Sequence, residues 1–421
     1  MAITAAPRLH RTLTLSLGLL FLVVVSWVWQ HAGAQERVAA PPSPLNLDQC
    51  IQLGLERQPA LAAARASLNA AYSGNQAVAN LPRTARVVSR DIPIRIEQSC
   101  LGITIASAGL EQAEWETRYA VMRTFYSIQY AKMQKQVIDN AVRKIDDAYK
   151  KAKEIVEQGD PKSKVTTIDV DTLAINKEFI KTKQAEASVG IEKATAGLRE
   201  AIGLDLSYPL EVADTPLPAL VAELNKNELI SQAVSNRAEL EQALTMNRIT
   251  ELEIVAQRRI WFRLESKTFA AGGDIHAKPI PQGVANGEYR PGAIGPEMPV
   301  FLFGSRADRV QRAMDFNDRA IAVVDKTENL ITLEVEATFL NWKQAKQNVQ
   351  NLKETPKMAQ SVSDRVRKRF FDDNASGEEF LRASTLEDQA KALYNQALFE
   401  HALALAALER VTAGGYRVPR P

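Results

Sequence analysis

Residues 138–170 read IDNAVRKIDDAYKKAKEIVEQGDPKSKVTTIDV, and this stretch decides the fold. Its first half predicts a helix that packs along another helix, because apolar residues recur at alternating spacings of three and four. These residues are Ile138, Ala141, Ile145, Ala148, Ala152 and Ile155. Gly159 and the residues up to 163 end the helix, and Thr166, three positions before Asp169, predicts a capping box that starts the next one. The stretch therefore predicts a long helix, a turn and a returning helix.

The same arrangement recurs later in the chain. Its apolar stripe is Val335, Phe339, Trp342, Ala345, Val349 and Leu352. The turn DDNASG at 372–377 follows, and Ser376 precedes Glu379 by three residues, again as in a capping box. Asp169 and Glu379 are 210 positions apart, as are Leu198 and Leu408 near the ends of the two returning helices. The chain is thus predicted to contain two copies of one helical hairpin.

The two copies differ in length at one place. Pro59 and Ala238 are 179 positions apart, but Phe125 and Phe339 are 214 apart, so the second copy holds 35 more residues before its long helix. In the first copy, Ile92, Ile94 and Ile96 alternate with polar residues or proline as in a strand, yet Asp91 and Pro93 suit a helix start. A helix over residues 92–158 would match residues 305–371 of the second copy in length, so we favour the helix. Pro356 is expected to kink the second long helix.

Helices of this length restrict the possible architectures. At about 1.5 Å per residue, residues 305–371 would span about 100 Å. Such a helix needs lateral packing along its whole length, which implies a coiled-coil assembly within one chain or between several. The fold class predicted is mainly α, with duplicated long hairpins and short β segments.

The N-terminus predicts export. Arg8 and Arg11 precede an apolar run that closes at Ala32-Gly33-Ala34, which is typical of a secretory signal. The predicted divisions are a signal peptide (1–34), a linker (35–46), a first hairpin repeat (47–213), a second repeat (214–414) and a tail (415–421). The second repeat contains a Pro/Gly-rich β or loop insertion at about 261–304.

Composition argues against an enzyme and against nucleic acid as a partner. Loss of Arg8 and Arg11 with the signal lowers the formal net charge from +2 to zero, and the remaining charges interleave as on solvated helix faces. His276 and His401 are the histidines left after the signal, too few for a His-rich metal or catalytic site. We therefore predict no catalytic residues, no metal site and no cofactor. Cys50 and Cys100 are expected to be unpaired, although export permits one bridge.

The insertion at 261–304 has two interpretations. Residues 261–266 suit a strand, and the region is long enough for two membrane strands of about 9–11 residues. Its aromatic residues would then lie at the membrane interface: Trp261, Phe269, Tyr289, Phe301 and Phe303. The alternative is an irregular surface loop.

These motifs together resemble the TolC-type outer-membrane efflux proteins. The resemblance covers nearly the whole chain after the signal. It rests on the duplicated layout, on the hairpin returns at Asp169-Val170 and Glu379-Phe380-Leu381, and on the pattern Leu-x-Leu-x-x-Cys-x-x-x-Gly-Leu-x-x-Gln-Pro at 45–59. The resemblance implies a homotrimer in the outer membrane, with most of each chain in the periplasm. Three chains with two strands each would then share a small outer-membrane β-barrel. It also implies a periplasmic adaptor, an inner-membrane pump and outer-membrane lipid as partners.

The resemblance also implies a site. In this family the hairpin tips close a tunnel and are gripped by the adaptor. Carried over by position, the docking or gate residues are Gly159, Thr166, Asp169, Val170, Asp372, Asp373, Ser376, Glu379, Phe380, Leu381 and Arg382. Arg382 stands where the family carries a second acid, and helix capping accounts equally well for Asp169 and Glu379.

The function implied is that of an outer-membrane channel, a passive exit duct in a tripartite efflux or type I secretion system. The alternative is a periplasmic coiled-coil scaffold that has lost the pore. The shorter first copy favours that alternative, because its deficit falls where the family inserts membrane strands.

Overall fold

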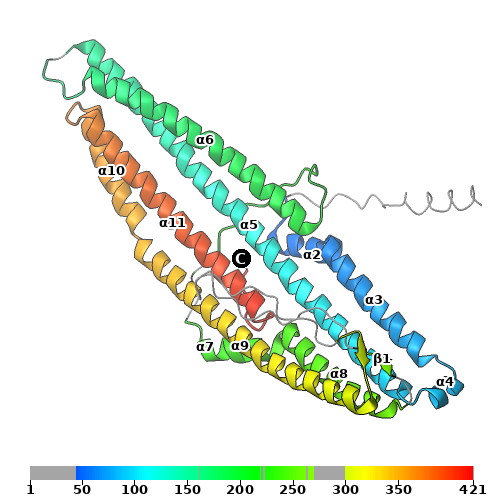
Figure 1. Ribbon diagram of the computed structural model, residues 1–421. Helices are drawn as coiled ribbons and strands as arrows, with labels where there is room; N and C mark the ends of the chain where they lie inside the picture. The colour runs from blue at the N-terminus through cyan, green and yellow to red at the C-terminus, as the bar shows by residue number, and fades with distance from the viewer. Residues whose placement is uncertain are drawn as a thin grey trace, which may run out of the picture. The chain divides into compact units, whose positions relative to one another are not determined.

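The computed structural model describes residues 44–159, 161–218, 220, 223–261, 264–269 and 299–420. The predicted signal, His276 and Tyr289 lie outside these residues. Helices dominate the described part (Figure 1). The elements are α2 (Leu47–Arg57), α3 (Pro59–Ala79), α4 (Arg83–Val88), α5 (Ile92–Gln158), α6 (Thr167–Ile202), α7 (Lys226–Asn236), α8 (Ala238–Arg259), β1 (Glu265–Lys267), β2 (Phe301–Phe303), α9 (Arg306–Leu352), α10 (Thr355–Phe371) and α11 (Gly377–Val411).

The first hairpin consists of α5 and α6. Helix α5 is continuous over 67 residues, which confirms the helix favoured over a strand at Ile92. It ends at Gly159, whose φ of 66° is left-handed and suits glycine. The predicted stripe is buried in the structure except at Ile138, where the neighbouring Val137 is the buried residue instead.

The second hairpin consists of α9, α10 and α11. Its first half was predicted to be one helix kinked at Pro356, and the structure bends at residues 353–354, where both residues keep right-handed helical backbone angles and separate α9 from α10. Pro356 lies in the first turn of α10, where its missing N–H is tolerated, whereas inside a continuous helix it would remove a hydrogen bond and its ring would clash. The capping box of Ser305 and Asp308 starts α9.

The duplication is visible in the matched lengths of corresponding helices. Helices α2 and α7 each have 11 residues, α3 and α8 have 21 and 22, and α6 and α11 have 36 and 35. Residues Pro44–Pro421 nevertheless form one compact unit, so the boundary between residues 213 and 214 stays a prediction.

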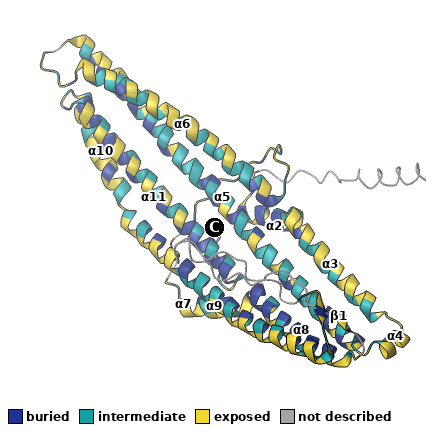
Figure 2. Ribbon diagram, viewed as in Figure 1, coloured by how far each residue is buried: buried dark blue, intermediate teal, exposed yellow. Residues whose placement is uncertain are grey.

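Helix α5 is the element that the others share. It contacts α2, α3, α6, α8 and α11, and α11 in turn contacts α9 and α10. The two hairpins therefore lie side by side and run to a common end (Figure 1). Buried residues follow the contacting faces, while the outer faces are exposed (Figure 2). The core is thus a long seam rather than a globular centre.

The opposite end is where the copies differ. In the first copy, α4 and short turns join α3 to α5. In the second copy, β1 and β2 form an antiparallel pair of three-residue strands between α8 and α9. The strand predicted at 261–266 is therefore shorter and later than expected, and Trp261 lies outside it. Residues 270–298 lie outside the described part. No described helix is both long enough and apolar enough to cross a membrane.

A partly buried ion cluster joins the middle of the bundle. Glu334 of α9 pairs with Arg237, which precedes α8, and with Arg410 of α11 at 2.6 Å. Arg237 also pairs with Glu239 at 2.6 Å, and Arg410 with Glu116 of α5 at 2.9 Å. Burial alone would raise the pKa of Glu334, but the two guanidinium groups lower it overall. The cluster connects both copies through α5, α9 and α11.

We predict that Glu334→Gln lowers the free energy of unfolding by about 2–3 kcal/mol at neutral pH, because the buried Arg237 and the partly buried Arg410 each lose one charged partner. The loss is read from urea unfolding. The folded-state pKa is depressed, so the stabilisation is present above the ordinary value of 4.5 and disappears as the pH falls through the folded pKa. The gap between variant and wild type should therefore close in acid.

Glu336→Gln is the matched control. Glu336 lies two residues away on the same helix and pairs with Lys226 at 2.7 Å, with both side chains about two-fifths exposed. An exposed pair contributes about 0–1 kcal/mol. Equal losses in the two variants would show that the cluster has no special weight.

Candidate functional site

The first hairpin tip is the turn between α5 and α6. Gly159 caps α5, and a Cβ at this position would meet no atom within 4 Å. Thr166 caps α6 in the predicted capping box: the Asp169 N–H donates to Thr166 Oγ1 at 3.3 Å, and the Thr166 N–H donates to Asp169 Oδ2 at 2.9 Å. The capping role of both residues is thereby confirmed.

The second tip is the turn between α10 and α11. Asp372 is exposed at the end of α10. Ser376 caps α11 by accepting from the Glu379 N–H at 3.2 Å. Glu379 does not complete a capping box; its carboxylate lies 3.9 Å from Arg369 instead, with both side chains more than half exposed. The predicted capping box is therefore only half formed in this copy, whereas Arg382 is exposed as a surface residue.

An apolar core lies beneath both tips. The rings of Phe370 and Phe380 have centroids 5.0 Å apart, and both side chains are buried. Residues from the first hairpin complete this core, among them Ile155, Val165 and Leu173. Val170 and Leu381 pack against it and are partly buried. Phe380 thus acts by packing the tips together.

Two contacts between the tips were not predicted from the sequence. The carboxylate of Asp373 accepts from the Ser163 hydroxyl at 2.9 Å and from the Lys164 N–H at 3.1 Å. Gly377 lies so close to α6 that a Cβ would be 2.7 Å from both Cβ and Oδ1 of Asp169. The only sequence signal was the clustering of polar and small residues in the two turns. That clustering indicates turns but does not indicate which turn residues meet.

Charged contacts continue between the hairpins below the tips. Lys144 of α5 pairs with Glu387 at 2.9 Å and Asp388 at 2.7 Å, both on α11. Burial alone would raise the pKa of Glu387, but hydrogen bonds from Lys391 and Lys144 lower it overall. Burial raises the pKa of Asp388. One lysine thus holds two carboxylates of the neighbouring hairpin.

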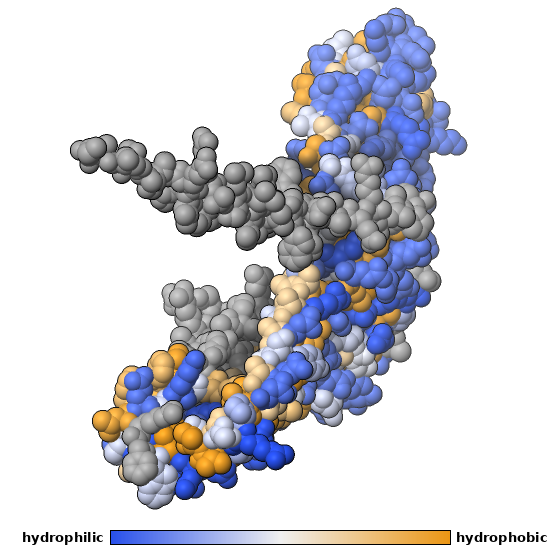
Figure 3. All heavy atoms as spheres, turned by 90° about the vertical axis from the view of Figure 1, so that its right-hand side faces the viewer, coloured by the Kyte–Doolittle hydropathy of each residue, from blue (hydrophilic) through white to orange (hydrophobic). Residues whose placement is uncertain are grey.

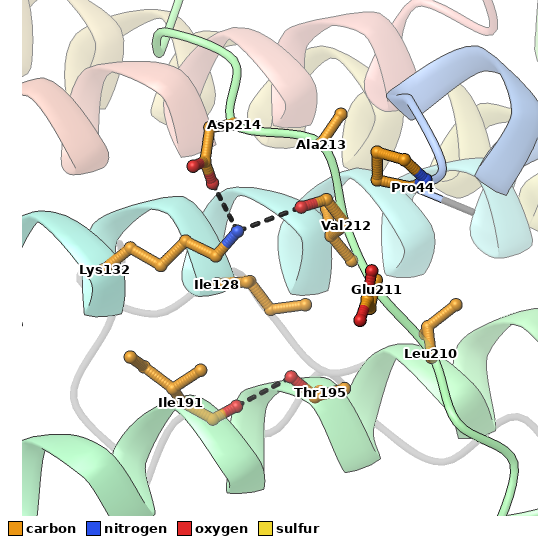
Figure 4. Close-up of a pocket in the computed structure, with 10 residues that line it drawn as sticks. All are labelled: Pro44, Ile128, Lys132, Ile191, Thr195, Leu210, Glu211, Val212, Ala213 and Asp214. Atoms are coloured by element: carbon orange, nitrogen blue, oxygen red, sulfur yellow. Dashed lines mark hydrogen bonds and ion pairs between the residues drawn. The ribbon is translucent and has the colours of Figure 1, made fainter.

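A cavity of about 410 Å³ lies between α5, α6 and the chain that follows α6 (Figure 4). Its lining includes Ile128, Ile191, Leu210 and Val212. Lys132 donates to the Val212 carbonyl at 2.9 Å and pairs with Asp214, so its ammonium group holds the connecting segment against α5. The polar contacts in this cavity therefore fasten the segment that joins the two copies.

Chemistry-bearing groups are sparse in the described residues. They contain no cluster of three or more His, Cys, Asp or Glu side chains that could hold a metal ion. His401 is fully buried, and burial lowers its pKa to about 4. Cys50 and Cys100 are free thiols; burial raises the pKa of Cys50 to about 12, which makes it a poor nucleophile. The described tips hold helix caps and packing residues.

We predict that Gly377→Ala separates the tips and costs about 1–3 kcal/mol of stability, because the new methyl group overlaps Asp169. Hydrogen exchange of the amides at 166–170 and 377–381 should accelerate. The control is Gly190→Ala in α6, where a Cβ meets no atom within 4 Å. This control should gain about 0.5–1 kcal/mol, because alanine is a better helix former. Unchanged exchange in the Gly377 variant would contradict the contact.

No protein-family model and no curated protein sequence matches the chain. Several solved structures do match it. Among solved structures, the outer-membrane channel OprN is 15% identical with a TM-score of 0.69, covering 88% of this chain and 90% of that one. The CmeC outer-membrane channel of Campylobacter jejuni is 14% identical with a TM-score of 0.67, covering 88% and 86%.

The open-state MtrE outer-membrane channel of Neisseria gonorrhoeae is 16% identical with a TM-score of 0.67, covering 88% of this chain and 89% of its own. Identities at this level establish the fold and leave the activity to separate argument. The chain therefore has the TolC-type fold, the paired long-hairpin architecture of these outer-membrane channels.

Proposed function

We propose that this protein is the outer-membrane channel component of a tripartite efflux or type I secretion system. It would serve as a passive exit duct across the periplasm and the outer membrane. The proposed assembly is a homotrimer whose tips are gripped by a periplasmic adaptor, with an inner-membrane pump delivering the substrate. The duct acts by shape and electrostatics, without catalysis.

The observation that carries this proposal is the pair of long hairpins tied together at one end. At about 1.5 Å per residue, the 67 residues of α5 extend about 100 Å, roughly three times the hydrocarbon thickness of a bilayer. Such a length suits a structure that bridges the space between two membranes. The outer-membrane channels with the same fold support this assignment.

The tips are the proposed docking and gate region. Their buried members, Phe380 and the partly buried Val170 and Leu381, would hold the two turns in register. Their exposed members, Asp372, Glu379 and Arg382, would face the adaptor or a neighbouring subunit. Both signs of charge occur here, so we propose a polar docking surface rather than an acidic ring.

One observation favours a second candidate, a periplasmic scaffold without a pore. In the first copy, α4 occupies the place where the channel family inserts membrane strands. The two candidates differ in how the protein is attached to the membrane. Extraction from membranes by salt alone supports the scaffold, whereas a requirement for detergent supports the channel.

The decisive test is conductance. Trimers purified from outer membranes should conduct ions across a planar bilayer, and a stable membrane-free monomer without conductance would sink the channel proposal.

Asp373→Ala should raise the conductance or the open fraction, because it removes the bonds to Ser163 and Lys164 that hold the tips together. Glu186→Ala removes the same charge from an exposed position on α6, away from the tips, and should conduct like the wild type.

A further inference from the structure

Polar side chains lie mainly on the surface of this bundle, and the upper part of the face shown in Figure 3 is mainly hydrophilic. His401 of α11 is an exception. Its side chain is fully buried, and neither ring nitrogen has a hydrogen-bond partner among the described residues. A buried imidazole without partners costs free energy that an apolar side chain of similar size would not cost. The packing of α11 alone therefore does not explain a histidine here.

His401 lies in the seam between α9 and α11. The apolar core of this seam contains Leu405 of α11, one turn after His401, and Trp342 of α9. Trp342 is also fully buried, and its indole N–H has no hydrogen-bond partner within the described part of the chain. Lys346, one turn after Trp342, places its ammonium group 5.1 Å from the centroid of the Trp342 ring. Two unpartnered polar groups and one cation thus share an apolar seam.

The charge that acts on His401 is positive. Burial and, to a lesser degree, the ammonium group of Lys346 lower the pKa of His401 to about 4. Lys346 is itself buried and pairs with Glu223, in the segment before α7, at 2.7 Å. The Glu223 side chain is 82% exposed, so its carboxylate balances the lysine at the surface and not the imidazole beneath.

No carboxylate on the described elements around α11 compensates a proton on His401. Helix α11 packs against α5, α6, α9 and α10. The charged groups on these helices that do not act on His401 include Lys132 and Lys144 on α5, Arg199 and Glu200 on α6, Lys343 on α9, and Arg367 and Arg369 on α10. On α11 itself, Glu400 is exposed and accepts from Gln396 at 2.8 Å.

A proton on His401 would place a second positive charge beside Lys346 inside the apolar seam. A buried charge without a counter-charge is costly, so the protonated imidazole is stabilised by reaching water. Since His401 is fully buried, water reaches it when α9 and α11 separate locally. We infer that His401 is an acid trigger, whose protonation opens the seam between α9 and α11 in the middle of the bundle.

This inference adds a form of regulation to the proposed duct, and its consequence for export rests on the proposed function. The trigger lies in helices of the second hairpin, away from the contacts of Asp373 at the tips. Acid would therefore loosen the wall of the duct rather than act first on its gate.

The test is hydrogen exchange of the Trp342 indole N–H, followed by NMR in protein that carries isotope-labelled tryptophan. Because this N–H is buried and has no partner in the described residues, it exchanges when the seam opens. The closed seam holds the neutral imidazole, so this contribution to its stability is full above the ordinary histidine pKa of 6.5 and is lost as the pH falls toward 4. Its protection factor should fall about 20-fold between pH 7 and pH 5.

Trp115 of α5 is the internal reference, because it lies outside the seam between α9 and α11. Protection of its indole N–H should not follow that of Trp342. If both indoles lose protection together in acid, the whole bundle is loosening, and the local trigger is overturned.

His401→Leu removes the titrating group and should leave the protection of Trp342 equal at pH 7 and pH 5. His276→Leu is the matched control, since it removes the other histidine that follows the predicted signal, and it should respond to acid like the wild type. His401→Gln keeps a polar side chain that does not titrate, and it takes the place of the leucine variant if that variant does not fold. An acid response that persists without the imidazole overturns the inference.

Lys346 provides an independent variant. Lys346→Gln removes the neighbouring cation, so His401 should accept its proton, and the seam should open, at a higher pH than in the wild type. Lys343→Gln removes the same charge from an exposed position of α9 and should leave the response unchanged. Equal pH midpoints in these two variants would contradict the coupling of Lys346 to the trigger.

Conductance separates this inference from the channel proposal. Indole exchange reports on the seam whether or not the protein conducts. A chain that conducts but shows no acid response at Trp342 overturns the trigger alone. A chain whose seam opens through His401 but which never conducts overturns the channel alone.

Discussion

The rest of this structure depends on lateral packing of helices that are too long to stand alone. A helix of 67 residues gains little from any globular core, so its stability comes from neighbours along its length. Helix α5 has such neighbours throughout, with α3 and α8 along one half and α6 and α11 along the other. Small residues such as Ala148 and Ala152, both fully buried, let the neighbouring backbones approach closely.

Apolar contacts between long helices specify their register weakly, because shifting one helix along the other replaces one small residue with a similar one. Ion pairs between the helices fix the register. Lys144 meets two carboxylates of α11, and Glu334 meets arginines from two other segments. Each of these contacts holds in one register only, and breaking one leaves a buried charge without its partner. At the tip itself, the Asp373 carboxylate accepts hydrogen bonds from the Ser163 hydroxyl and the Lys164 N–H. The apolar seams thus supply adhesion, while the ionic contacts select the register.

Much of this fold follows from local signals in the sequence. Pro93 in the first turn and Gly159 mark the two ends of α5, and the capping box of Thr166 with Asp169 marks the start of α6, because these signals act within a few residues. The bonds between the tips could not be predicted, since Asp373 and Ser163 are 210 positions apart and meet only after both hairpins have formed. Glu379 was wrongly expected to complete a capping box, because its carboxylate lies toward Arg369 instead. Local patterns therefore identified the caps of the site but not its partners.

The break at residues 353–354 makes the two hairpins mechanically unequal. Helices α5 and α6 are unbroken, so bending either one must distort many helical hydrogen bonds at once. Helices α9 and α10 meet where those bonds are interrupted, and the continuous α11 packs against both of them. The first hairpin should therefore resist bending more than the second hairpin does. In the second hairpin, bending should concentrate at residues 353–354 beside Pro356, which lie a full helix (α10) away from the tip.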